Sequence, residues 1–206
     1  MPNIYAFKGV KPYIHPKAFV HPQAIITGNV EIGAEVYIGP GAAIRGDWGK
    51  IIIEAGCNVQ ENCTLHMFPG TTVHLMEGAH VGHGAVIHGA RLGPNCLIGM
   101  NSVIMDDVEI GEACIVGALS FVAAQQRFGP RQLIVGNPAK AIKTVSEAMI
   151  RWKTEGTALY RELARNGNRD IKACRPLRKP ATSKANASPL QTYKTVSYTH
   201  LRAHET

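Results

Sequence analysis

The stretch AFVHPQAIITGNVEIGAEVYIGPGAAI, residues 18–44, carries an aliphatic residue at every sixth position. The same spacing recurs along most of the chain, and two short insertions interrupt it. A repeat of this length predicts one short strand and one corner for each six residues. Three repeats then form a triangular coil, in which residues about 18 apart stack and bury one another. The repeated positions are Ile14, Val20, Ile26, Ile32, Ile38, Ile44, Ile53, Val59, Leu65, Leu75, Val81, Ile87, Leu92, Ile98, Ile104, Ile110, Val116 and Val122.

The repeat resembles that of the hexapeptide family, which implies an all-β solenoid in the form of a left-handed parallel β-helix. We expect this domain to span residues 1–142 and to end near the sequence LIVGNPAKAI. A C-terminal helix is predicted within residues 143–178, with Ser146 as its N-cap and Asn166-Gly167 as its stop. Residues 179–206 show no periodicity and are predicted to be a disordered or non-native tail.

Four of the five cysteines share one repeat position, four residues after an aliphatic core residue. Small residues such as Ala18 and Ala85 fill this position elsewhere. We therefore expect these thiols to be buried core groups rather than nucleophiles, and their odd total argues against a disulfide framework. They are Cys57, Cys63, Cys96 and Cys114, while Cys174 lies outside the repeats.

The net charge of +7 does not by itself indicate nucleic-acid binding. Residues 175–206 hold six lysines and arginines against one acidic residue, so the repeat region is nearly neutral. A basic patch with interleaved aromatic residues is not evident there. No apolar run approaches the length of a membrane span, and the first residues do not have the pattern of a secretion signal. We expect a cytoplasmic protein that binds neither nucleic acid nor membrane.

Histidines cluster in LHMFPGTTVHLMEGAHVGHGAVIHG, residues 65–89. His66 and His88 each follow a core aliphatic residue, and once the inserted loop is subtracted they lie one coil apart, so they should stack. Arg45 has the same place one coil earlier. His83 falls beside a different corner, from which it can meet this column only in a neighbouring subunit. His74 and His80 lack the register and are expected in loops or on the surface.

Three imidazoles with one coordination position open to water are typical of a catalytic zinc site. Cyclic packing would place one such site at each interface of a homotrimer. The alternative is that these histidines decorate a polar face.

The segments RGDWGKIIIEAGCNVQENCTLH, residues 45–66, and HVGHGAVIHG, residues 80–89, resemble the signature of γ-class carbonic anhydrases. The resemblance implies that His66, His83 and His88 bind the metal, with His83 coming from the adjacent subunit. It implies that Gln60 orients the metal-bound water and that Arg45 makes a salt bridge across the interface, for which Glu61 is a candidate partner. Asp47 and Asn58 would belong to the surrounding hydrogen-bonding shell.

The helix segment WKTEGTALYRELARN and the following RPLR resemble the PaaY and CaiE types of this family. The PaaY resemblance implies a zinc-dependent thioesterase, in which metal-bound hydroxide attacks CoA thioesters in phenylacetate or other aromatic-acid degradation. Alternatives are a carbonic anhydrase that hydrates CO2, although the acidic proton-shuttle loop is missing, and a CaiE-like accessory protein for CoA-linked carnitine enzymes. A hexapeptide acyltransferase is less favoured. Fe2+ or Co2+ could replace Zn2+, because both accept imidazole.

Overall fold

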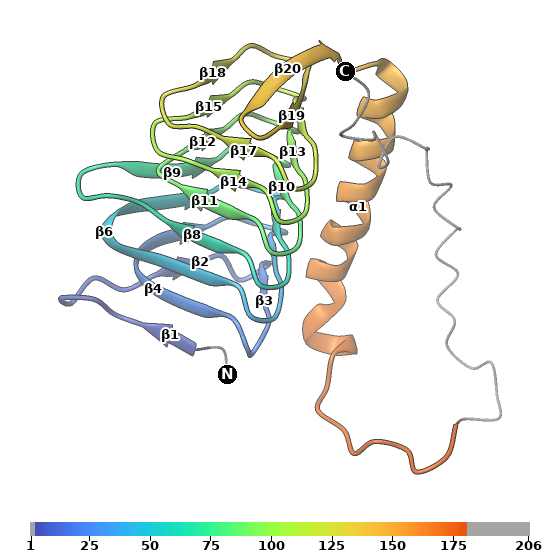
Figure 1. Cartoon of the computed structure of the whole chain (residues 1–206). Helices are drawn as coiled ribbons and strands as arrows, with labels where there is room; N and C mark the ends of the chain where they lie inside the picture. The colour runs from blue at the N-terminus through green and yellow to red at the C-terminus, as the bar shows by residue number, and fades with distance from the viewer. Residues whose placement is uncertain (1–2, 181–206) are drawn as a thin grey trace.

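The chain folds into a three-sided parallel β-helix with one long helix along one side (Figure 1). The structure is a computed structural model that describes residues 3–180. The left-handed parallel β-helix with a C-terminal helix that the sequence predicts is confirmed.

Each coil contributes one short strand to each of three faces. The face under the helix, here called the helix face, contains β3 (Phe19–Val20), β5 (Tyr37–Ile38), β7 (Asn58–Val59), β10 (His80–Val81), β13 (Leu97–Ile98), β16 (Ile115–Val116) and β19 (Gln132–Gly136), and antiparallel β20 (Ala139–Thr144) closes it.

The second face contains β1 (Asn3–Tyr5), the first halves of β4 (Ile25–Ile32) and β6 (Ala43–Ile53), β8 (Thr64–His66), β11 (Val86–His88), β14 (Val103–Ile104) and β17 (Phe121–Val122). The third face contains β2 (Tyr13–Ile14), the second halves of β4 and β6, β9 (Thr72–Leu75), β12 (Arg91–Leu92), β15 (Glu109–Ile110) and β18 (Arg127–Phe128).

The aliphatic repeat positions form the core as three internal columns. Register pairs such as Val59↔Val81 and Ile87↔Ile104 show that residues one coil apart lie directly above one another. From Ile26 to Val122 every repeat position is at most 3% exposed. Each fully buried side chain of this size contributes roughly 1.5–3 kcal/mol relative to an exposed one. The predicted stacking is therefore confirmed.

The four cysteines at the shared repeat position are buried, and Cys174 is exposed, as expected. Burial raises the pKa of Cys57 and Cys96 to about 12 and that of Cys63 to about 11. Thiols with such pKa values stay protonated at neutral pH and are poor nucleophiles.

The first insertion lies at the corner between the second and third faces, where two coils approach closely. A Cβ at Gly46 would lie 2.4 Å from the Asn29 carbonyl oxygen, and one at Gly28 would lie 2.5 Å from the Gly46 carbonyl oxygen. Only glycine fits such a contact. The second insertion, between β8 and β9, forms the teal loop that projects beside β9 in Figure 1.

Helix α1 (Glu147–Asp170) begins as predicted, with the Ser146 hydroxyl accepting a hydrogen bond from the Met149 amide at 3.3 Å. The stop predicted at Asn166-Gly167 is wrong, because the helix continues to Asp170. Gly167 packs against the Phe19 ring, which a Cβ at this position would meet at 2.5 Å. The glycine therefore serves close packing rather than helix termination.

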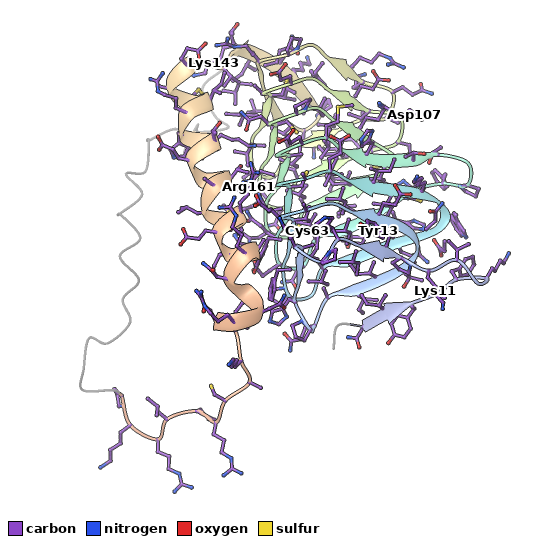
Figure 2. All side chains as sticks on the ribbon, turned by 180° about the vertical axis from the view of Figure 1, so that it is seen from behind. Lys11, Tyr13, Cys63, Asp107, Lys143 and Arg161 are labelled. Atoms are coloured by element: carbon purple, nitrogen blue, oxygen red, sulfur yellow. The ribbon has the colours of Figure 1, made fainter. Side chains whose placement is uncertain are left out.

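Charged side chains also hold α1 on the helix face. Arg161 and Arg165 both bond to the Glu35 carboxylate, with Nε–O distances of 3.0 and 2.8 Å. Figure 2 shows Arg161 between the helix and the coils. The buried Lys153 ammonium donates to the Gly78 carbonyl oxygen at 2.5 Å and to Asn95 Oδ1 at 2.7 Å. Within residues 3–180, no helix is long and apolar enough to cross a membrane.

Candidate metal centre

His66 and His88 stack at the corner where the second face ends. They are register partners at the ends of β8 and β11, and their ring centroids lie 5.4 Å apart. Ile44 pairs with Leu65 in the same way, so Arg45 follows in the adjacent position of β6. The column that the spacing predicts is thus present within one subunit.

Each of these two imidazoles has a carboxylate on one ring nitrogen. Asp47 Oδ1 lies 2.9 Å from His66 Nε2, and Asp106 Oδ1 lies 2.7 Å from His88 Nδ1. Arg45 Nη1 lies 3.3 Å from the second oxygen of Asp47. Within residues 3–180 no hydrogen bond involves the opposite nitrogens, Nδ1 of His66 and Nε2 of His88, and these are the atoms that would bind a metal. A carboxylate behind a histidine ligand fixes its tautomer and makes the ring more basic.

Two aromatic rings flank the histidine pair. The Trp48 ring centroid lies 5.1 Å from that of His66, and the Phe68 ring centroid lies 5.0 Å from that of His88. Trp48 and Phe68 are 48% and 56% exposed, so their apolar surface is available to a neighbour or a ligand. Both residues lie in the insertions, where the repeat gives no register, and the sequence pattern could not place them.

His83 lies at a different corner, between the helix face and the second face. Its side chain is 48% exposed, and its Nδ1 lies 2.5 Å from Glu61 Oε2. The other oxygen of Glu61 accepts a hydrogen bond from the Tyr37 hydroxyl at 3.1 Å. Among the described residues of one chain, no three His, Cys, Asp or Glu side chains are grouped to hold a metal. Joining His83 to the stacked pair requires a second subunit, which remains a prediction.

Gln60 and Asn58 lie under α1 rather than beside His66. Gln60 is 2% exposed, and its Nε2 donates to Asn58 Oδ1 at 3.0 Å and lies 2.5 Å from His80 Nε2. Both residues belong to the coil that leads to Glu61. The role of Gln60 in orienting a metal-bound water, and that of Asn58 in the surrounding shell, remain predictions.

His74 is a partly exposed residue of a strand rather than of a loop, and the expectation that His80 is a loop or surface residue is wrong. His74 lies in β9, where its Nε2 is 2.7 Å from Glu54 Oε1. His80 begins β10 and points toward α1, where burial lowers its pKa to about 3. Neither residue directly follows one of the six-residue repeat positions, so the repeat register could not show that helix and sheet partners would contact them.

Asp106 is a residue of the candidate site that sequence reasoning missed. It lies 18 residues after its partner His88. The coil is only 17 residues long here, because Ile87 pairs with Ile104, so the register points to Met105 and the repeat period alone does not locate Asp106.

The donor set suits a divalent transition metal. A carboxylate contacts one ring nitrogen of His66, His88 and His83, and in the described part of the chain the other nitrogen of each has no hydrogen bond. This is the pattern expected of histidines that bind zinc and similar ions. Imidazole ligands alone do not select among zinc, iron and cobalt.

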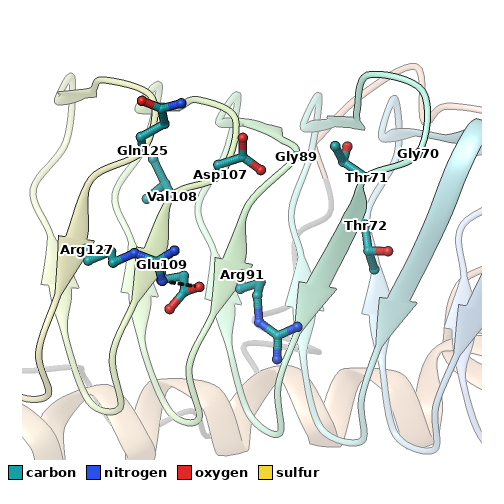
Figure 3. Close-up of a pocket in the computed structure, with 10 residues that line it drawn as sticks. All are labelled: Gly70, Thr71, Thr72, Gly89, Arg91, Asp107, Val108, Glu109, Gln125 and Arg127. Atoms are coloured by element: carbon teal, nitrogen blue, oxygen red, sulfur yellow. Dashed lines mark ion pairs between the residues drawn. The ribbon is translucent and has the colours of Figure 1, made fainter.

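A shallow groove of about 510 Å³ extends over the third face, from Gly89 to Arg127 (Figure 3). Gly89, which follows His88, and Asp107, which follows Asp106, line its near end. Farther along, Arg127 forms an ion pair with Glu109. Arg91 lies on the adjacent strand, so two cationic and two anionic side chains line the groove.

Comparison with known proteins agrees with the fold. Residues 11–46 and 89–124 match the family model "Bacterial transferase hexapeptide (six repeats)". The chain is 35% identical to the crystallised product of the BC4754 gene of Bacillus cereus, provisionally named an acetyltransferase, over 81% of this chain and 96% of that one, with a TM-score of 0.79. For a hexapeptide transferase family protein from Anaplasma phagocytophilum the values are 29% identity, 80% and 97% coverage, and a TM-score of 0.77. The fold is therefore that of the hexapeptide transferases.

More specific similarity comes from curated sequences. The chain is 46% identical to carnitine operon protein CaiE of Escherichia coli K12 over 176 residues, which cover 85% of this chain and 90% of the relative. The chain is also 46% identical to CaiE of Salmonella agona, and the aligned residues cover 85% of this chain and 88% of that protein. The chain thus belongs to the hexapeptide-repeat family that contains carnitine operon protein CaiE.

Proposed function

We propose that this protein is a CaiE-like accessory protein for CoA-linked enzymes that act on carnitine, and that its working centre is a divalent metal held between subunits of a homotrimer. The family assignment supports the accessory role, because 85% of the chain aligns with CaiE at 46% identity. The observation that carries the metal centre is the stacked pair of His66 and His88, each backed by a carboxylate.

In this proposal one subunit supplies His66 and His88, and its neighbour supplies His83. Asp47 and Asp106 hold the first two rings in one tautomer and orientation, and Glu61 does the same for His83. Arg45 neutralises the charge of Asp47, to which it is bonded at 3.3 Å. Zn2+, or Fe2+ or Co2+ in its place, would supply a Lewis acid that lowers the pKa of water to about 7.

The same residues support a second candidate function, in which the protein itself hydrolyses CoA thioesters in the manner implied by the PaaY resemblance. The groove beside His88 favours this candidate over CO2 hydration, because its volume of about 510 Å³ exceeds what CO2 needs. Arg91 and Arg127 on its floor could contact the anionic groups of a CoA ester. CO2 hydration does not need such a groove. Acyl transfer, which the names of structural relatives suggest, would use the groove but does not need a cluster of three histidines.

The proposal is tested with purified protein of measured metal content. The activities of CoA-linked carnitine enzymes are measured with and without the protein, and hydrolysis of acyl-CoA, CO2 hydration and acyl transfer are measured with the protein alone. His83→Ala is compared with His74→Ala, which removes a carboxylate-paired histidine outside the centre.

Stimulation of the carnitine enzymes that is lost in His83→Ala and kept in His74→Ala would support the accessory role. If the protein alone hydrolyses thioesters, and His83→Ala loses this activity while His74→Ala keeps it, the protein is a thioester hydrolase and not an accessory protein. Equal metal content in the two variants and the parent would contradict the metal centre.

A further inference from the structure

The outward side chains of the helix face form a column that α1 covers. Successive members are register partners, each one coil above the last. The ends of the column are apolar and its middle is polar. From the first coil to the last, it consists of Phe19, Tyr37, Asn58, His80, Leu97, Ile115 and Leu133.

Packing alone does not explain the polar middle. At the two ends, Phe19 packs with Ala164, and Ile115 and Leu133 pack with Met149, as an ordinary helix-on-sheet contact requires. Under the centre of α1, Asn58 Nδ2 and His80 Nδ1 are buried without a hydrogen-bond partner in the part of the chain that the structure describes. Unsatisfied buried polar groups cost stability, so their presence at this level calls for a functional reason.

The polar middle lies at the level of the coils that carry the candidate site residues. Asn58 begins the strand that leads to Gln60 and Glu61, and His80 begins the strand that leads to His83. The Gln60 amide is held directly between Asn58 and His80, at 3.0 and 2.5 Å.

A second set of contacts starts from the same column and ends at His83. The Tyr37 hydroxyl donates to Glu61 Oε1 at 3.1 Å, and Glu61 Oε2 lies 2.5 Å from His83 Nδ1. The orientation of the exposed His83 ring therefore depends on where Tyr37 holds the Glu61 carboxylate.

One helix residue contacts both sets. The Tyr160 ring packs edge-on against His80, with centroids 5.3 Å apart and an interplanar angle of 86°. It also packs against Tyr37, with centroids 5.4 Å apart. Through these two rings, the position of α1 is coupled to the Gln60 amide and to the imidazole of His83.

We propose that Tyr160 is a positioning residue, through which α1 sets the orientation of Gln60 and His83 by way of His80 and Tyr37. This inference rests on the proposed function, because it assigns to the helix control of the same metal centre. Since His83 would serve the histidine pair of the neighbouring subunit, the helix of one subunit would act on a metal that its neighbour shares.

The test compares Tyr160→Ala with Met149→Ala, which removes a helix contact at the apolar end of the column. Full-length protein is titrated with Co2+, and the ring resonances of His83 are recorded by NMR in the metal-free protein. We expect Tyr160→Ala to weaken Co2+ binding about 10- to 100-fold, the usual effect of losing a group that orients a ligand. It should also shift the His83 resonances. Met149→Ala should do neither, and Tyr160→Phe, which keeps the ring, should resemble the parent.

Equal effects of Tyr160→Ala and Met149→Ala on both measurements would overturn the inference. If the parent does not bind Co2+ but Tyr160→Ala alone shifts the His83 resonances, the positioning role stands and the proposed metal centre fails. Should Tyr160→Ala not fold, Tyr160→Leu takes its place and is judged by the same two measurements.

Discussion

His80 is a largely enclosed imidazole under α1, and its desolvation makes the stability of the fold depend on pH. Burial first, and then the nearby Lys153 charge, lowers its pKa from the ordinary value of 6.5 to about 3. Above pH 6.5 the ring is neutral in both the folded and the unfolded chain. As the pH falls from 6.5 toward 3, only the unfolded chain gains the proton, so stability is lost over this range.

The resulting prediction concerns the free energy of unfolding measured by urea denaturation at pH 7 and pH 4. Between these values the parent should lose about 3 kcal/mol more than His80→Gln, which cannot be protonated. If both proteins lose the same free energy of unfolding between pH 7 and pH 4, His80 is not the titrating group.

Asp106 should matter for metal binding because it is the partner of His88. We expect Asp106→Asn to weaken binding of Zn2+ or Co2+ by about 10- to 100-fold, since a weaker acceptor no longer orients the ring. Asp107→Asn is the matched control, because Asp107 is the adjacent residue and lines only the groove. Isothermal titration calorimetry of both variants checks the difference, and similar affinities would argue against His88 as a ligand.

At the scale of single residues, the six-residue repeat predicts the position only of side chains that keep a fixed place relative to its core residues. Arg45, His66 and His88 could be aligned because each directly follows a core residue. Trp48 and Phe68 lie in insertions, and the ring that packs against His80 is that of Tyr160, which belongs to a helix from far along the chain. Such contacts are tertiary, and a local pattern does not contain them.

At the scale of elements, α1 shows how a sound local rule can give the wrong boundary. Asn-Gly commonly ends helices, but Gly167 lies inside α1 because the Phe19 ring occupies the space of a side chain. The Ser146 cap involves only neighbouring residues, and for that reason it could be predicted from sequence.

Gly167→Ala tests this explanation. Alanine favours a helix by up to about 1 kcal/mol over glycine, yet its Cβ would overlap Phe19. Because overpacking costs about 1–3 kcal/mol, we expect a net loss of about 1–2 kcal/mol in thermal or urea denaturation. Adding Phe19→Leu should recover part of this loss. An increase in stability from Gly167→Ala alone would show that the ring yields without cost.

At the scale of the whole molecule, the six-residue period was sufficient to predict the solenoid, because every coil repeats the same burial. The repeat does not determine how subunits assemble. His83 and the stacked pair lie at different corners of one chain, and the stacked pair is flanked by the exposed rings of Trp48 and Phe68. These features support an interface between subunits, and a single chain can only imply it.

The most direct test of the subunit-bridging centre is metal content in mixed trimers. His66→Ala and His83→Ala variants, each expected to bind no metal alone, are co-expressed in equal amounts. An interface is intact when the His83→Ala subunit supplies His66 and His88 and the His66→Ala subunit supplies His83. Random mixing makes about a quarter of the interfaces intact, so metal content should return to about a quarter of the parent value. Mixed trimers without metal, despite a metal-loaded parent, would place all three ligands within one subunit and contradict the account.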